Sequence, residues 1–173
     1  MLSLKALAQA SGRKTPREIE QLRGRLRMWT EGDPDQPLIR AIDTGGRNKR
    51  YSRDDLGVIV LADSLTDLGL GHDAVFAVMA DRGRFMRWYE YAADCATSPP
   101  SYPTYARLAI YRLQNTEPTF WGWKFENSGG APEAFEDRVA KLYRKHDVLI
   151  LDMVRLLKPY AKLIELAREV DHG

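Results

Sequence analysis

The chain has 173 residues, with 26 Lys and Arg against 24 Asp and Glu, which gives a formal net charge of +2. Apolar residues make up 44% of it, enough for one hydrophobic core, so the composition excludes wholesale disorder. The single cysteine, Cys95, excludes an internal disulfide and every multi-cysteine metal site, and no apolar run reaches the roughly 18 residues of a membrane span.

The small net charge conceals an asymmetry along the chain. Residues 1–53 carry a net charge of +6, whereas the remaining residues carry −4. A basic segment on an otherwise acidic chain is typical of a module that meets a polyanion. The alternative is a set of solvated helices that are basic by chance, so the arrangement of the charges has to decide.

The first third of the chain predicts two short helices joined by a tight turn. Leu2, Leu4 and Leu7 recur at helical spacing until Ser11-Gly12, a helix-terminating pair. Residues 15–18, Thr-Pro-Arg-Glu, then form a capping box with proline at the first helical position. The apolar stripe of the second helix is made of Ile19, Leu22, Leu26 and Trp29. Together these features indicate a helix-turn-helix.

A β-hairpin and further helices are predicted next. Short strands at residues 38–42 and 50–51 flank Gly45-Gly46, which gives a hairpin with a basic tip. Apolar spacing then predicts helices over residues 56–69, over 72–79 and after Gly83. The proline-rich residues 98–103 are the best internal boundary, and aromatic-rich runs at 105–113 and 119–125 are compatible with a second hairpin.

The last 40 or so residues show an uninterrupted heptad pattern. From Phe135 to Val170, apolar residues alternate steps of four and three, which is the a/d seam of a coiled coil. We expect a long helix that forms a dimer, with a kink or break just before Pro159. The alternative is a long helix that folds back on its own domain. The predicted dimer-interface residues are Leu142, Leu149, Met153, Leu156 and Leu163.

From Leu4 to about Met79, the chain resembles the MerR family of bacterial winged-helix transcription regulators. The match is closest at residues 50–56, Arg-Tyr-Ser-Arg-Asp-Asp-Leu, followed by Ile59, Leu65 and Leu68-Gly69-Leu70 in the family's order and spacing. Arg17 and Ile19 stand where the family has an Arg and an Ile in its recognition helix. The resemblance implies an N-terminal winged helix-turn-helix, double-stranded DNA as partner, and RNA polymerase or a small effector as further partners.

Several basic residues are positioned to contact DNA. If the apolar stripe faces inwards, Arg17 and Gln21 lie on the outer face of the second helix, where Arg pairs with guanine and Gln with adenine. Residues in the preceding turn, on the helix borders and in the hairpin are candidate phosphate contacts. The sequence is at least as consistent with a half-buried Tyr51 in a strand as with a Tyr51 that contacts phosphate. The full predicted DNA-binding set is Arg13, Lys14, Arg17, Gln21, Arg23, Arg25, Arg47, Lys49, Arg50 and Tyr51.

The residue inventory argues against an enzyme. The three histidines, at positions 72, 146 and 172, are far apart and lie in no metal-ligand motif, and no glycine-rich phosphate loop or nucleophile elbow is present. We therefore expect no catalytic residues, no metal and no cofactor. Trp121, Trp123 and Tyr105 are candidates for a pocket that binds an effector, with a place in the core as the alternative.

The sequence therefore predicts a mainly α fold with small β-hairpins, in three parts. These are a winged helix-turn-helix domain over residues 1–82, a helix, proline-rich linker and aromatic hairpin over 83–131, and a long coiled-coil helix over 132–173. We expect a cytoplasmic, sequence-specific regulator of transcription that binds a (pseudo)palindromic operator as a homodimer. The alternatives are an architectural or excisionase-like DNA-bending protein and, in another class, a coiled-coil protein–protein adaptor.

Overall fold

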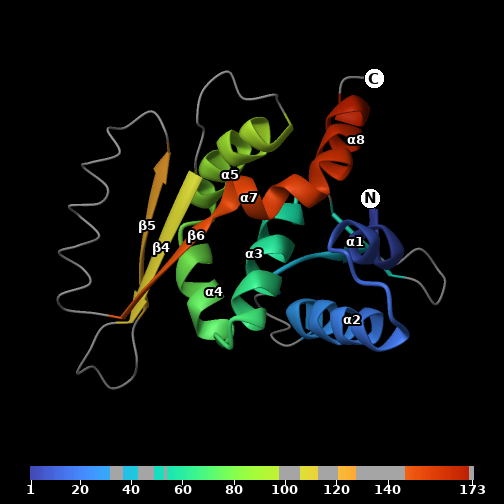
Figure 1. Ribbon diagram of the computed structural model, residues 1–173, viewed down its shortest axis with the longest axis horizontal. Helices are drawn as coiled ribbons and strands as arrows, with labels where there is room; N and C mark the ends of the chain where they lie inside the picture. Colours follow the sequence, from blue (N-terminus) through green and yellow to red (C-terminus); the bar gives the residue numbers. More distant parts are fainter. Residues whose placement is uncertain are drawn as a thin grey trace.

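A computed structural model describes residues 1–31, 37–42, 49–52, 54–97, 106–112, 121–127 and 147–171. Over these residues the protein is mainly helical, with two small antiparallel sheets at opposite ends of the molecule (Figure 1). The predicted class, mainly α with small hairpins, is confirmed at this level.

Strands and helices are interspersed along the chain. The strands are β1 (Leu2–Ser3), β2 (Ala41–Ile42), β3 (Arg50–Tyr51), β4 (Ala106–Arg112), β5 (Trp121–Asn127) and β6 (Asp147–Asp152). The helices are α1 (Leu4–Ala10), α2 (Pro16–Glu31), α3 (Leu56–Asp67), α4 (His72–Met79), α5 (Arg82–Thr97), α7 (Met153–Leu157) and α8 (Ala161–Asp171), with a 3-10 turn η1 (Lys158–Tyr160).

Helices α1 and α2 are joined by the tight turn that the sequence predicts. Gly12 adopts a left-handed backbone conformation, with a φ of 76°, which glycine tolerates without strain. At the start of α2, the Thr15 N–H donates to Glu18 Oε2 at 2.9 Å, and the Glu18 N–H donates to Thr15 Oγ1 at 3.3 Å. This reciprocal pair is the predicted capping box, and Pro16 is the first helical residue as expected.

The strands of the N-terminal sheet lie on both sides of this helical pair along the chain, because β1 precedes α1 and both β2 and β3 follow α2. Its strand order is β1-β3-β2, and both pairings are antiparallel. Tyr51 of the central strand β3 faces Leu2 on one side and Ala41 on the other. The predicted pairing of β2 with β3 is confirmed, whereas β1 was not predicted, because its two residues were assigned to the first helix.

The second sheet has the order β5-β4-β6, again antiparallel throughout. The hairpin of β4 and β5 is the one predicted from the aromatic-rich runs. Leu108 of β4 lies opposite Phe125 on β5 and Leu151 on β6, and these side chains face the helices. Phe125 stacks on Trp88 of α5 with ring centroids 4.5 Å apart, which attaches the sheet to the helical layer.

The prediction of one continuous helix from about residue 132 onward is wrong at residues 147–152, which form β6. The run Asp-Val-Leu-Ile-Leu-Asp is short and apolar, and such runs satisfy helical and strand patterns alike. Asp152 marks the change of structure, because its carboxylate accepts the backbone N–H of Val154 at 3.1 Å and so caps α7. Pro159 then lies in η1, near the kink that the sequence predicts.

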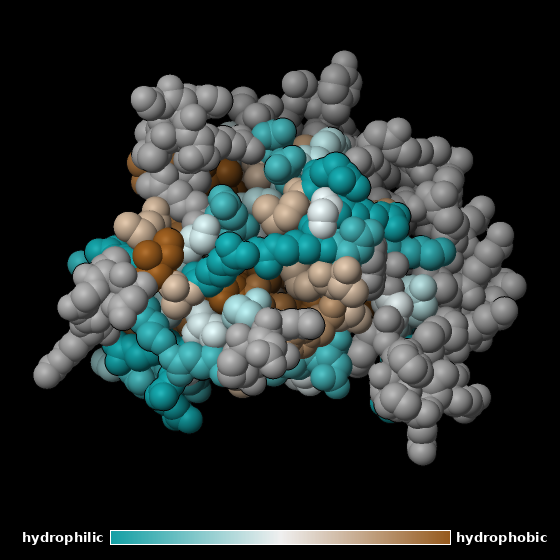
Figure 2. All heavy atoms as spheres, turned by 180° about the vertical axis from the view of Figure 1, so that it is seen from behind, coloured by the Kyte–Doolittle hydropathy of each residue, from teal (hydrophilic) through white to brown (hydrophobic). Residues whose placement is uncertain are grey.

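One hydrophobic core joins the two ends of the molecule. It includes Leu26 of α2, Leu61 of α3, Phe85 of α5, Leu108 of β4 and Leu157 of α7, all fully buried. Hydrophilic side chains cover much of the described surface on the face shown in Figure 2, with smaller apolar areas between them. Helices α1 and α2 are therefore held by the rest of the chain through shared apolar packing.

Candidate nucleic-acid interface

A basic groove of about 1060 Å³ lies between α1, α2 and the N-terminal sheet. Its apolar lining comes from Leu4 and Ala8 of α1, Ile19 of α2 and Tyr51 of β3. Seven of its fourteen lining residues are basic, and a single one is acidic. The basic residues are Lys5, Arg13, Lys14, Arg23, Arg27, Lys49 and Arg50, and the acidic one is Glu31.

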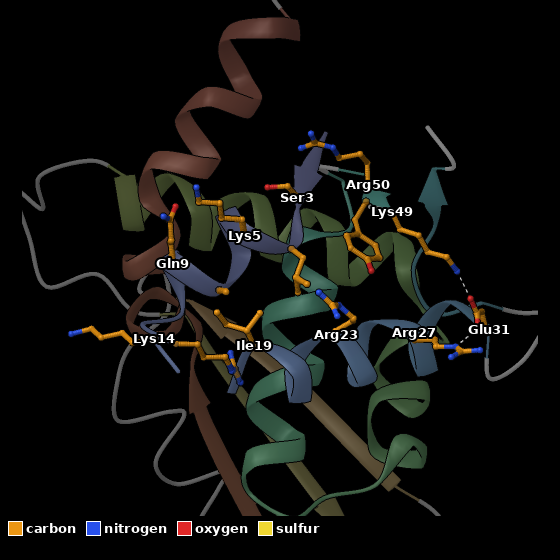
Figure 3. A pocket seen from close by; sticks show the side chains of 14 residues that line it. Ser3, Lys5, Gln9, Lys14, Ile19, Arg23, Arg27, Glu31, Lys49 and Arg50 are labelled. Carbon is orange, nitrogen blue, oxygen red and sulfur yellow. Dashed lines mark hydrogen bonds and ion pairs between the residues drawn. The ribbon is translucent and has the colours of Figure 1, made fainter. Parts of the chain in front are cut away.

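The charged side chains are spread along the length of this basic groove. Figure 3 shows Lys14 at one end, pointing outwards, and Arg27 with Lys49 at the other end, where both meet Glu31. Arg23 lies between these ends, one helical turn after Ile19. A row of cations with this spread provides several separate contacts for a polyanion.

Arg13 and Arg25 were both predicted to contact DNA, but the structure engages them elsewhere. Arg13 Nη1 lies 2.7 Å from Asp63 Oδ2, and Arg25 Nη1 lies 2.6 Å from both Asp63 Oδ1 and Asp67 Oδ1. The Asp63 side chain is only 8% exposed, and the two arginine side chains are 14% and 20% exposed. These guanidiniums fasten the helix-turn-helix to α3, so we remove them from the DNA-binding set.

Burial and hydrogen bonding have opposite effects on the pKa of Arg25. Burial alone would lower the pKa of its guanidinium, but the hydrogen bonds from it to Asp63 and Asp67 outweigh this effect and raise the pKa. Arg25 is therefore firmly charged within the cluster. The sequence analysis had placed Arg25 on the border of the exposed face of α2, where a cation would be available to a phosphate.

The outer face of α2 carries the two predicted base contacts. Arg17 and Gln21 are both exposed, as the apolar stripe of α2 predicts, while Leu22 and Leu26 are buried. Gly24 is also exposed, and a Cβ built on it would meet nothing within 4 Å. The backbone of α2 is thus open to close approach at the centre of its solvent-facing side.

Two acidic residues of α2, Glu20 and Glu31, form ion pairs with cations of the groove. Arg23 Nη1 lies 2.7 Å from Glu20 Oε2 on the same helix. Glu31 accepts a hydrogen bond from Arg27 Nε at 2.8 Å and a second one from Lys49 Nζ. The hydrogen bonds from Lys49 and Arg27 lower the pKa of the Glu31 carboxyl, so Glu31 is ionised at neutral pH.

The predicted hairpin contacts divide into three groups. Lys49 and Arg50 are exposed and line the groove, as a wing contact requires. Tyr51 is only 4% exposed, and burial raises the pKa of its hydroxyl, so it is a core residue at the groove floor rather than a phosphate ligand. Arg47 lies outside the described residues.

Two cations of the groove, Lys5 and Arg27, are not among the residues predicted to bind DNA. Lys5 is exposed on α1, and Arg27 follows Arg23 by four residues, which places both arginines on one side of α2. This i, i+4 spacing was the available signal for Arg27. Lys5 carried no comparable signal, because the sequence does not show which side of α1 faces the groove.

Several residues of the predicted dimer seam pack instead in the hydrophobic core of their own chain. Met153 is fully buried, and Leu149, Leu156 and Leu163 pack against the same core, while Leu142 lies outside the described residues. The expected interface required a continuous helix, and β6 interrupts that helix. Met153 is therefore not available to a second copy.

The remaining predictions concern effectors, metals and membranes. Of the three residues predicted to line an effector pocket, Tyr105 lies outside the described residues. Trp121 and Trp123 belong to β5, but the structure describes only their backbone. In the described part of the chain, no three His, Cys, Asp or Glu side chains are grouped so as to hold a metal ion. Among the described helices, none is both long and apolar enough to cross a bilayer.

Comparisons with protein-family models, with curated proteins and with solved structures found nothing that matches this chain.

Proposed function

We propose that this chain is a sequence-specific, double-stranded-DNA-binding regulator of transcription with an N-terminal winged helix-turn-helix. The order β1, α1, turn, α2, β2, β3, with β3 in the centre of the sheet, supports this proposal. In this arrangement α2 is the recognition helix and the hairpin of β2 and β3 is the wing.

The observation that carries the proposal is the basic groove beside α2. Six of its cations are not engaged with Asp63 or Asp67, and they come from α1, from the turn before α2, from α2 itself and from β3 with the residue before it: Lys5, Lys14, Arg23, Arg27, Lys49 and Arg50. DNA carries regularly spaced phosphates, and Lys and Arg neutralise them. The side chains of α2 thus combine phosphate contacts on one flank with base contacts on its exposed side.

A division of roles follows from where the side chains lie. Arg17 and Gln21 enter the major groove and contact base edges, because they lie near the N-terminus of α2 and point to solvent. Gly24 lets the helix backbone come close to the duplex. The cations of the basic groove hold one strand's phosphates and set the register of the helix.

The resemblance to MerR regulators supports the same function and adds partners to it. Binding as a homodimer to a (pseudo)palindromic operator, and control through RNA polymerase or a small effector, enter the proposal on that resemblance. Because Met153 is buried, we place self-association on a surface other than the heptad seam.

Selection of bound sequences from random duplex DNA tests this function. We expect the wild type to enrich one motif, and Arg17→Ala to lose about 1–3 kcal/mol on that motif with much less effect on random DNA. Equal losses on both would make Arg17 a phosphate contact. Failure of the wild type to enrich any sequence would contradict sequence-specific regulation.

A further inference from the structure

Glu31, the one acidic residue among those lining the basic groove, neutralises two of its cations at once. It is the last residue of α2, and its two carboxylate oxygens have different partners. Oε2 accepts from Arg27 Nε at 2.8 Å, and Oε1 accepts from Lys49 Nζ, just before β3 (Figure 3). The carboxylate therefore links the end of the recognition helix to the base of the wing.

The ion pair of Glu31 differs from the other pair on this flank. Glu20 binds Arg23 one turn away on the same helix, so that pair involves one element and one cation. Glu31 engages cations from two elements, and both of them line the groove. A phosphate that binds Arg27 or Lys49 has to compete with a carboxylate that is already in place.

We propose that Glu31 is an autoinhibitory residue of the basic groove, whose carboxylate competes with DNA phosphates for Arg27 and Lys49. The inference rests on the proposed function, since it names a control built into the same site. Glu31 acts on phosphate contacts alone, so it weakens binding to every duplex alike and leaves the choice of sequence to Arg17 and Gln21.

Salt dependence gives this competition a measurable signature. Each cation that neutralises a phosphate of duplex DNA contributes about 0.9 to the slope of log K against log salt concentration. Glu31→Gln keeps the size of the side chain and removes its charge, which frees Arg27 and Lys49. We expect the slope to steepen by about 1.8 and the affinity for a random duplex at 0.1 M salt to rise about tenfold.

The matched control is Glu165→Gln on α8, which changes the net charge equally at an exposed residue that does not line the groove. Binding of a random-sequence duplex is measured from 50 to 200 mM KCl for the wild type and both variants. A steeper slope for Glu31→Gln alone supports the proposal. Equal slopes for the two variants, or weaker binding by Glu31→Gln, overturn it in favour of a net-charge effect or of a Glu31 that positions the wing.

A variant that lacks both cations tests whether Glu31 acts through Arg27 and Lys49. In a chain carrying Arg27→Gln and Lys49→Gln, adding Glu31→Gln should leave the slope unchanged, and a remaining increase would contradict the proposal. Elution from heparin separates this inference from the proposed function. Later elution of Glu31→Gln than of Glu165→Gln supports the competition even if the wild type enriches no DNA sequence, and identical elution overturns it.

Discussion

Asp63 is the residue that best shows how helices α1 and α2 are held in place. Its buried carboxylate forms an ion pair with Arg13, in the turn between α1 and α2, and accepts a hydrogen bond from Arg25 in the middle of α2. Asp63 and Asp67 lie four residues apart on one face of α3, but this spacing does not show which residues they meet. Pairing between residues 38 or more positions apart has no local signature, so it could not be predicted from one sequence.

Asp63→Asn should therefore destabilise the fold. The variant leaves two partly buried guanidiniums with the exposed Asp67 as their remaining carboxylate partner, and we expect it to lower the free energy of unfolding by about 2–3 kcal/mol in chemical denaturation. Asp67→Asn is the matched control, because Asp67 is 57% exposed and should cost less than about 1 kcal/mol. Equal losses for the two variants would contradict a special role for the buried carboxylate.

At the scale of elements, local chemistry made α2 predictable and left β6 unpredictable. The capping box, Pro16 and the apolar stripe of α2 all lie within a few residues of one another, and each is found as expected. In β6, the short apolar run of four residues between two aspartates fits a helix and a buried strand equally well. Pairing with β4, which lies 35 or more residues earlier, decides between them.

The capping box also predicts how the stability of α2 depends on pH. Backbone N–H groups of Thr15 and Lys14 donate to Glu18 and lower its pKa below the ordinary value of 4.5. A lowered pKa in the folded state stabilises the fold above the unfolded pKa, and this contribution is lost as pH falls through the folded value. Glu18→Gln should thus be less stable than the wild type at pH 7, with the gap closing below about pH 4.5.

Denaturation of the wild type and of Glu18→Gln between pH 3 and pH 7 measures this gap. A difference in unfolding free energy that stays constant over the whole range would show that the Glu18 charge does not stabilise the helix start. This helix start is part of the proposed binding surface, since Lys14 lines the groove and Arg17 follows in the first turn.

At the scale of the whole molecule, the C-terminal segment packs directly on the helix-turn-helix. Tyr160 of η1 is buried and lies beside Ser11 of the turn, and burial raises the pKa of its hydroxyl. The charge asymmetry of the sequence correctly indicated a basic N-terminal surface. Only some residues of this surface could be predicted from the sequence. Helix periodicity places Arg17 and Gln21 on the exposed face of α2, whereas the groove depends on how α1, α2 and the N-terminal sheet pack together.

The affinity of the wild type for duplex DNA at increasing salt tests the central claim most directly. With about four phosphate contacts from the groove cations that Glu31 does not engage, the association constant should fall roughly 10²-fold between 50 and 200 mM KCl. Reversing the charge of Arg23 to Glu should flatten that dependence, and the same change at Arg87, exposed on α5, should not. An association constant that changes less than about threefold over this range would contradict a DNA-binding groove.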